Sequence, residues 1–201
     1  MHSVVLGGGI ASGKSLASEM LMDMGATVAD LDYIARDVRN RPAMKAKLGE
    51  RFGSQIFNEE GCLDTKKLAE AAFKTPEDTE ALNAILHPAI AETAFAVMRN
   101  YGEMPAKGVF IMQVPLLDKS VDLNQMADEV LLISAPAELR LERAIARGMA
   151  AEDAKARIEA QASDEELRCI ADTVIENVGT SDELWDKLAR WYRERMEAQL
   201  R

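Results

Sequence analysis

The 201-residue chain is 48% hydrophobic and 29% charged, which excludes disordered and collagen-like proteins and allows a full core. Its net charge of −10 and its 5% of aromatic residues argue against a nucleic-acid-binding surface. The two cysteines, Cys62 and Cys169, lack metal-ligand spacing. We expect neither a secretory leader nor a membrane span, because the sequence shows no charged start followed by a long apolar region and no run of eighteen apolar residues. We therefore expect a cytoplasmic protein without membrane or nucleic-acid partners, a monomer in the first instance, with an oligomer left open.

Short apolar runs without polar alternation predict strands that are buried on both faces. Each run is closed by Gly, Asp, Pro or Asn, and the runs cover residues 3–6, 27–29, 109–114, 129–134 and 173–176. Helical patterns separate them, beginning with residues 14–24. Strands that alternate with helices indicate an α/β fold, and we expect a parallel, five-stranded sheet.

Two insertions interrupt this alternation within a single expected domain, residues 1–201. Residues 33–100 are too long for a simple crossover and predict a helical subdomain, with a helix cap at Asp64 and another at Thr75. Residues 137–168 are highly charged and lack a sizeable apolar cluster, so we expect a mobile segment there.

The end of the chain predicts one amphipathic helix. Thr180 and Glu183 have the spacing of a capping box. An apolar stripe follows at helical spacing, which indicates packing against the core rather than a partner site. Its members are Leu184, Leu188, Trp191, Tyr192 and Met196.

Residues 8–15 match the phosphate-loop pattern G-x-x-x-x-G-K-[ST], between a predicted strand and a predicted helix. Glycines let the backbone N–H groups surround phosphate oxygens, and the helix N-terminus adds positive charge. Lys14 is expected to reach the β- and γ-phosphates, and the Ser15 hydroxyl to bind Mg²⁺. The expected ATP-binding residues of this loop are Gly8, Gly9, Ile10, Ala11, Ser12, Gly13, Lys14, Ser15 and Leu16. The loop alone fits a kinase, an ATPase or a nucleotide-gated switch.

Asp30 and Asp32 follow the second predicted strand, and strand alternation would place both on one face. A carboxylate at the carboxyl end of a parallel strand borders the ligand crevice, where it can accept a proton or hold Mg²⁺ through water. A helix cap with a neighbouring surface acid is an equal alternative. Arg36 fits an ion pair with Asp32 or a contact with a substrate phosphate.

Arg140, Arg143 and Arg147 share an arc of about 60° on one predicted helix. Guanidinium groups suit spread phosphate charge, so these arginines form a candidate anion-binding cluster. The alternative is a solvated helix face paired with Glu138 and Glu142.

The chain resembles bacterial dephospho-coenzyme A kinases over nearly its full length. The matching stretches, in chain order, are GGGIASGKS, DLDYIARD, GCLDTKKL, LNAILHP, VPLL, LERAIARGM and ADTVIENVG. The phosphate loop is generic, whereas the order and spacing of the other stretches are much more specific.

This resemblance implies a P-loop, nucleoside-monophosphate-kinase-like core and phosphorylation of the ribose 3′-hydroxyl of dephospho-coenzyme A by ATP with Mg²⁺, the last step of coenzyme A biosynthesis. It implies that residues 33–100 bind the coenzyme and that residues 137–168 form an arginine-bearing lid. The roles it implies are a catalytic base at Asp32, acceptor-side contacts at Arg36 and His87, lid residues at Arg143 and Arg147, and an ATP contact at Asn177.

The chain departs from the family's usual residues at several positions. Gln113 stands where an acid is frequent, which weakens the case for a carboxylate ligand to Mg²⁺ from the third strand. Asp118 and Lys119 replace an aromatic residue and Glu, Gly7 replaces Thr, and Leu167 replaces a basic residue. Two further functions stay open: another small-molecule P-loop kinase, and a catalytically weak nucleotide-binding regulator of this fold.

Overall fold

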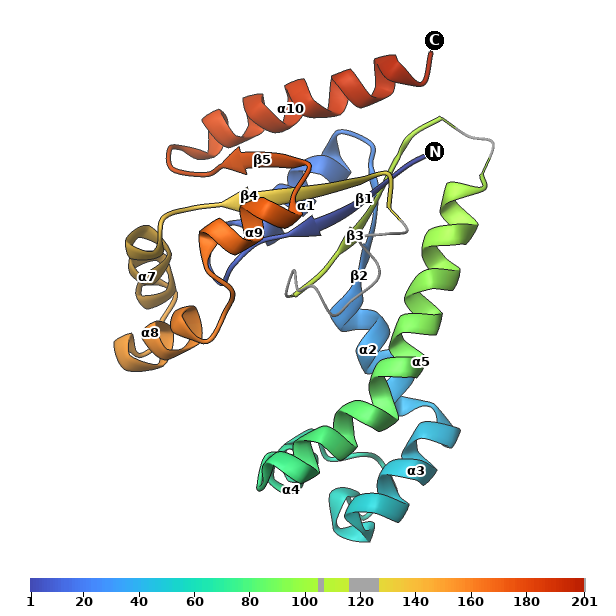
Figure 1. Ribbon diagram of the computed structural model, residues 1–201. Helices are drawn as coiled ribbons and strands as arrows, with labels where there is room; N and C mark the ends of the chain where they lie inside the picture. Colours follow the sequence, from blue (N-terminus) through green and yellow to red (C-terminus); the bar gives the residue numbers. More distant parts are fainter. Residues whose placement is uncertain (105–106, 116–126, 201) are drawn as a thin grey trace. The chain divides into compact units, whose positions relative to one another are not determined.

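Five parallel strands form one sheet, in the order β2-β3-β1-β4-β5 (Figure 1). The structure is a computed structural model that describes residues 1–104, 107–115 and 127–200. The strands are β1 (His2–Gly7), β2 (Thr27–Asp30), β3 (Val109–Gln113), β4 (Glu129–Ser134) and β5 (Thr173–Glu176). The predicted parallel α/β sheet is therefore confirmed, with β1 at its centre.

The helices lie between the strands and after the last one. They are α1 (Lys14–Asp23), α2 (Leu31–Asn40), α3 (Pro42–Phe52), the 3₁₀ helix η1 (Ser54–Ile56), α4 (Thr65–Ala72), α5 (Pro76–Gly102), α7 (Ala137–Ala146), α8 (Ala151–Glu159), α9 (Asp164–Ile170) and α10 (Ser181–Ala198). The predicted caps are present, since the Asp64 side chain accepts from Lys66 N and Thr180 forms the capping box with Glu183.

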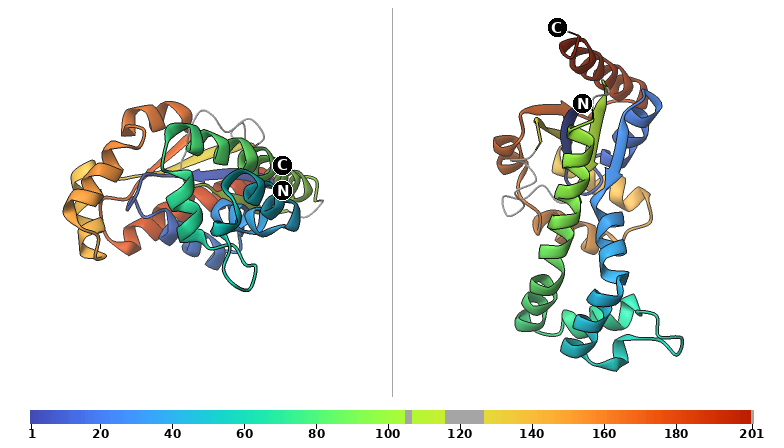
Figure 2. Two further views of the ribbon diagram at one scale, coloured as in Figure 1. Left: turned by 90° about the horizontal axis from the view of Figure 1, so that it is seen from below. Right: turned by 90° about the vertical axis from the view of Figure 1, so that its right-hand side faces the viewer.

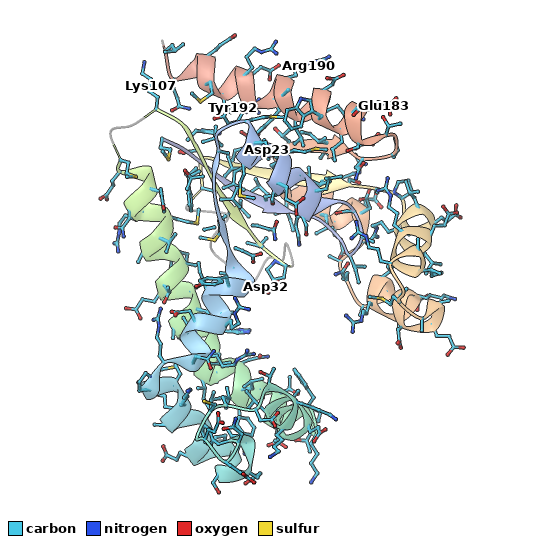
Figure 3. All side chains as sticks on the ribbon, turned by 180° about the vertical axis from the view of Figure 1, so that it is seen from behind. Asp23, Asp32, Lys107, Glu183, Arg190 and Tyr192 are labelled. Carbon is cyan, nitrogen blue, oxygen red and sulfur yellow. The ribbon has the colours of Figure 1, made fainter. Side chains whose placement is uncertain are left out.

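Each face of the sheet is covered by helices. The views of Figure 2 show α1 and α10 on one face and α9 on the other. On the first face, the inward side chains of β1, β3 and β4 pack against Leu21 of α1 and against Leu188 and Trp191 of α10. Tyr192, which is labelled in Figure 3, packs at the edge of the same core. On the opposite face, the ring of Phe110 stacks on Tyr101 at 4.4 Å between centroids.

The chain divides into two units. The first comprises Met1–Leu31 and Ala96–Arg201 and contains the sheet, and the second is Asp32–Phe95. The second unit has a core of its own, to which α3, η1, α4 and α5 contribute. Its buried members are Leu48, Phe52, Ile56, Leu68, Ala72 and Leu86.

Two local expectations are corrected by the structure. β2 ends at Asp30 and α2 begins at the next residue, so strand alternation does not extend to Asp32, which lies in the first turn of α2. Residues 137–168 contain α7, α8 and most of α9 and bury Ala144, Ala154 and Leu167, although their composition predicted a mobile segment without a sizeable apolar cluster. Small alanines produce weak hydrophobic periodicity, which explains why the sequence did not show this packing.

Among the described residues, α5 is the one helix long and apolar enough to cross a membrane by length and composition. No run of eighteen apolar residues marks this helix in the sequence, since His87 and Glu92 interrupt its apolar residues. Leu82, Ile85 and Ile90 of this helix pack against the core of the second unit, although only 17% of its most apolar window is buried. Length and composition alone are weak evidence of a membrane span.

The buried carboxylate of Glu129, at the start of β4, forms hydrogen bonds with residues near both ends of the described chain. Glu129 accepts hydrogen bonds from Trp191 Nε1 at 2.8 Å and from Arg195 Nη2 at 2.7 Å, and it bonds His2 Nε2 at 2.9 Å. Thr173 Oγ1 donates a fourth bond at 2.6 Å. Burial alone would raise the pKa of Glu129, but the bonds from His2, Arg195, Thr173 and Trp191 outweigh it and hold the pKa far below its usual range.

This depressed pKa predicts an acid-dependent loss of stability. Because the folded pKa lies below the unfolded value of 4.5, the ionised form stabilises the fold above that pH. This contribution disappears as the pH falls below 4.5 through the folded pKa. We expect Glu129→Gln to lower the free energy of unfolding by roughly 1.5–3 kcal/mol at neutral pH and to flatten its decline in acid. Urea denaturation across this pH range measures both effects.

Glu194→Gln is the matched control, because Glu194 pairs with Arg195 Nη1 at 2.9 Å while its side chain is 60% exposed. It is expected to leave the acid decline unchanged. A Glu129→Gln protein with the wild-type pH dependence would contradict the assignment.

Candidate active site

The phosphate loop connects the carboxyl end of β1 to the first residue of α1, as its pattern predicts. Its backbone has positive φ at Ala11 (57°) and Gly13 (99°), and Ser12 N donates to Gly9 O at 3.1 Å. A Cβ on Gly8 would lie 2.6 Å from the Ile133 carbonyl oxygen of β4. The loop therefore needs glycine both for its conformation and for its close approach to the neighbouring strand.

Asn177, one residue beyond β5, supports this loop from inside the protein. Its buried Nδ2 donates to Ser12 O at 2.8 Å, and its backbone N donates to Ser134 O at 2.8 Å. A Cβ on Gly13 would lie only 2.1 Å from that Nδ2. The side chain expected near ATP thus contacts the loop backbone directly.

Lys14 and Ser15 lie in the first turn of α1. Lys14 Nζ donates to Val114 O at 2.6 Å and to Pro115 O at 3.1 Å, which places the ammonium beside the end of β3. Ser15 is exposed, and Leu16 is partly buried and packs at the edge of the core. The charged and hydroxyl groups of the motif thus lie at the carboxyl edge of the sheet, where parallel sheets bind ligands.

Gln113, the last residue of β3, links Ser18 of α1 to Asp30 of β2. Its Nε2 donates to Asp30 Oδ2 at 2.9 Å, and its Oε1 accepts from the Ser18 hydroxyl. A carboxylate only accepts hydrogen bonds, so the amide nitrogen must face Asp30. Gln113 therefore holds Asp30 in place at the carboxyl edge of the sheet.

The three arginines of the predicted cluster have different environments. Arg140 of α7 is buried, with 5% exposure, and its Nε donates to Ala135 O at 3.1 Å. Arg143 is partly buried, and its Nη1 is buried without a partner among the described residues. Arg147 is exposed and lies one residue beyond the end of α7. The expected single helical face is therefore wrong in part, because Arg140 points into the protein and the helix ends before Arg147.

Within the described part of the chain, neither Glu138 nor Glu142 forms an ion pair with these arginines. Asp164, the first residue of α9, is the acid whose charge acts on Arg140. Burial lowers the pKa of Arg140, and the charge of Asp164 opposes that effect. Burial raises the pKa of Asp164, but hydrogen bonds from Arg168 and Ser134 and the charges of Arg168 and Arg140 outweigh this effect and hold the pKa below its usual value.

Arg168 has a structural task of its own. Its Nε donates to Asp164 at 2.7 Å and its Nη2 donates to Glu176 at 2.8 Å, which fastens α9 to the end of β5. Leu167 beside it is buried in the core. The Arg168 guanidinium therefore forms ion pairs with two carboxylates of the protein itself.

Gln161, which follows α8, contacts the phosphate loop although it belongs to no motif of the sequence. Its Oε1 accepts a hydrogen bond from Ile10 N of the phosphate loop at 2.8 Å. A lone glutamine in a charged segment carries no pattern that predicts such a contact. Arg140 was noted for its spacing, but the spacing did not reveal its burial beside the loop.

The remaining predicted residues belong to the second unit. Asp32 is exposed at the start of α2 (Figure 3), and Arg36, one turn later, has its guanidinium 5.1 Å from the ring centroid of Tyr33. His87 is exposed in α5, next to Pro88. Asp118 and Lys119 lie outside the described residues.

Among the described residues, no three His, Cys, Asp or Glu side chains group as a metal site. Mg²⁺ commonly binds through one or two protein oxygens together with substrate phosphates and water. The exposed hydroxyl of Ser15 beside the phosphate loop fits that mode of binding.

The fold and this loop define the class of protein. A parallel sheet whose central strand runs through a glycine-rich loop into a Lys-Ser helix start is a P-loop nucleotide-binding protein. A solved structure of a Thermus thermophilus protein has a TM-score of 0.77 and 31% identity, covering 96% of this chain and 97% of its own. A dephospho-CoA kinase from Campylobacter jejuni shares the fold, with a TM-score of 0.71 and 24% identity over 98% of both chains.

The family model for dephospho-CoA kinase matches residues 2–183. A dephospho-CoA kinase of Frankia casuarinae is 40% identical over 186 residues, which cover 92% of this chain and 79% of the relative. The chain belongs to the dephospho-CoA kinase family.

Proposed function

We propose that the protein transfers a phosphoryl group from ATP to the ribose 3′-hydroxyl of dephospho-coenzyme A, giving coenzyme A and ADP. The carrying observation is the complete phosphate loop, folded between β1 and α1, in a chain of this family. This reaction is the last step of coenzyme A biosynthesis.

On the donor side, residues 8–16 surround the phosphates with backbone N–H groups. Lys14 moves from the carbonyls of Val114 and Pro115 to the β- and γ-phosphates, because charged oxygens are the stronger acceptors. The Ser15 hydroxyl would bind Mg²⁺, and this ion would supply positive charge against the developing phosphate charge. Asn177 maintains the loop through Ser12 and borders the nucleotide.

On the acceptor side, Asp32 accepts the proton of the ribose hydroxyl as general base. Arg36 and His87 contribute binding contacts to the acceptor. All three belong to the proposed coenzyme-binding insertion, residues 33–100 with Asp32 directly before it.

Residues 137–168 form the proposed lid. Arg143 and Arg147 bring guanidinium donors to the transferring phosphoryl group, where preorganised charge is most effective. Within the described residues neither arginine has an ion-pair partner, so both are available to anionic oxygens.

We place the protein in the cytoplasm, as a monomer. Cys62 and Cys169 are free and exposed, which suits a reducing compartment. The net charge of −10 favours solubility and gives no general attraction to nucleic acid.

The direct test incubates the purified protein with ATP, Mg²⁺ and dephospho-coenzyme A and measures coenzyme A and ADP by mass spectrometry. Equal amounts of both products are expected. The 3′-deoxy analogue of the acceptor is the control, since it lacks the reacting hydroxyl and should give neither product. Turnover of a different nucleotide or sugar in place of dephospho-coenzyme A would indicate another kinase, and ATP binding without transfer to any acceptor would indicate a regulator.

Arg147→Ala is expected to lower kcat by roughly 10²–10³-fold, because it removes a donor aimed at transition-state charge. ATP affinity, measured by calorimetry, should fall far less. Arg190→Ala is the matched control, an exposed arginine of α10 whose loss should change neither quantity. A loss of ATP affinity as large as the loss of kcat would make Arg147 a ground-state binding residue instead.

A further inference from the structure

Two residues of the segment 137–168, Arg140 near its start and Gln161 near its end, meet the phosphate loop at Gly9. Near its start, Arg140 lies against Gly9, where a Cβ would be 2.2 Å from Nη1 and 3.0 Å from Cζ. Near its end, Gln161 Oε1 accepts from Ile10 N at 2.8 Å and lies 3.3 Å from the same Cβ position of Gly9. Arg143 and Arg147 lie between these two attachment points in the chain.

At this place two donors lie near one acceptor, and only one of them is bonded to it. Gln161 Oε1 is bonded to the Ile10 amide, whereas Arg140 Nη1 is buried and has no hydrogen-bond partner among the described residues. A charged donor without a partner is unfavourable inside a protein. Arg140 cannot turn away freely, because its Nε is bonded to Ala135 O at 3.1 Å.

A phosphate oxygen competes directly with Gln161. The Ile10 amide belongs to the loop whose N–H groups bind phosphate, and a charged oxygen is a stronger acceptor than a neutral amide carbonyl. If a phosphate oxygen takes the Ile10 amide, Gln161 Oε1 becomes available to the adjacent Arg140 Nη1.

We propose that Gln161 is a positioning residue whose Oε1 accepts the Ile10 amide bond before nucleotide binds. When a triphosphate oxygen takes over that amide, Gln161 Oε1 accepts a bond from Arg140 Nη1 instead. The exchange gives Arg140 its missing partner and moves the end of α8 relative to the loop. Nucleotide binding thereby sets the position of the segment that carries Arg143 and Arg147. This inference rests on the proposed function only in taking ATP as the ligand of the loop.

The test separates catalysis from binding. Gln161→Ala removes both the competitor for the Ile10 amide and the new partner of Arg140. We expect kcat to fall by roughly 10- to 100-fold through misplaced lid groups. The affinity for a non-hydrolysable ATP analogue with Mg²⁺, measured by calorimetry, should equal or exceed that of the wild type. Gln161→Glu restores an acceptor of the same reach, so kcat should recover while affinity weakens because the new charge faces the phosphates.

Gln199→Ala is the matched control. Gln199 Oε1 accepts from Gly108 N at 3.0 Å, the same kind of bond at the opposite end of the strands. Its loss should leave both kcat and nucleotide affinity unchanged. An equal fall of kcat and affinity in Gln161→Ala, or no change in either, would overturn the proposal.

A second measurement uses the wild-type protein, so it depends neither on turnover nor on the folding of a variant. In NMR spectra of the ¹⁵N-labelled wild-type protein, the ATP analogue should shift the Arg140 side-chain resonances as well as the Ile10 amide. An Ile10 shift without an Arg140 shift would also overturn the exchange. Because no acceptor is present, this result stands apart from failure of the proposed kinase reaction, which would show as binding without coenzyme A formation.

Discussion

Lys14→Ala is expected to lower turnover by at least about 10²-fold while the protein remains folded, because phosphoryl transfer depends mainly on positioning and charge stabilisation. The Lys14 ammonium lies at the carboxyl edge of the sheet, where it donates to the carbonyl oxygens of Val114 and Pro115 directly after β3. Its side chain is partly exposed, so its removal leaves no core cavity. Steady-state turnover at saturating ATP, together with the melting temperature, measures the effect.

The control for this change is Lys187→Ala. Lys187 Nζ donates to Glu176 O at 2.7 Å, so it loses the same kind of lysine-to-carbonyl bond away from the phosphate loop. Its turnover should match the wild type. Near-normal turnover of Lys14→Ala would remove Lys14 from the proposed mechanism.

Asp32→Asn should lower turnover by roughly 10²–10⁴-fold, the usual contribution of general-base catalysis. Asparagine keeps the size and hydrogen-bonding reach of the side chain but loses its charge and basicity. Asp32 is exposed in the first turn of α2, so the folded state should tolerate the change. The measurement compares turnover and ATP affinity of the two proteins at matched fractions folded.

A purely structural role for Asp32 predicts a different result. A carboxylate in the first helical turn stabilises a helix by about 0.3–1 kcal/mol, and its loss would change stability but hardly turnover. Asp182→Asn tests that effect alone, because Asp182 is an exposed acid in the first turn of α10. Turnover of Asp32→Asn within about threefold of wild type would be too small a loss for a general base.

The strands β1, β3 and β4 could be predicted because they are buried on both faces and therefore read as uninterrupted apolar runs, as in Val130–Ile133. The three helices of residues 137–168 were harder to recognise. Their buried positions are held by Ala144, Ala154 and Leu167 among many charged residues, so the apolar periodicity is weak. The boundary after Asp30 was also not predicted, because α2 begins directly after β2 and no loop residues mark the change.

In the site, features that depend on neighbouring residues could be predicted, whereas contacts between distant residues could not. The phosphate loop is a contiguous motif whose residue types follow from its backbone geometry. By contrast, the contact of Asn177 with Ser12 and that of Gln161 with Ile10 join residues 165 and 151 positions apart. Such contacts depend on the order of strands in the sheet, and the sequence contains no local pattern for them. Family resemblance indicated Asn177, but it did not indicate which atoms it contacts.

The carboxylate of Glu129 also affects the order in which the two units fold during synthesis. Two of its partners, Trp191 and Arg195, lie 62 and 66 residues further along the chain. Until they emerge, a sheet that includes β4 would bury a charge without most of its donors, which is strongly unfavourable. The second unit, Asp32–Phe95, has all its core residues in one continuous stretch and can assemble earlier. The nucleotide-binding half is thus completed last, and its apolar strands stay exposed to aggregation or chaperone binding for most of synthesis.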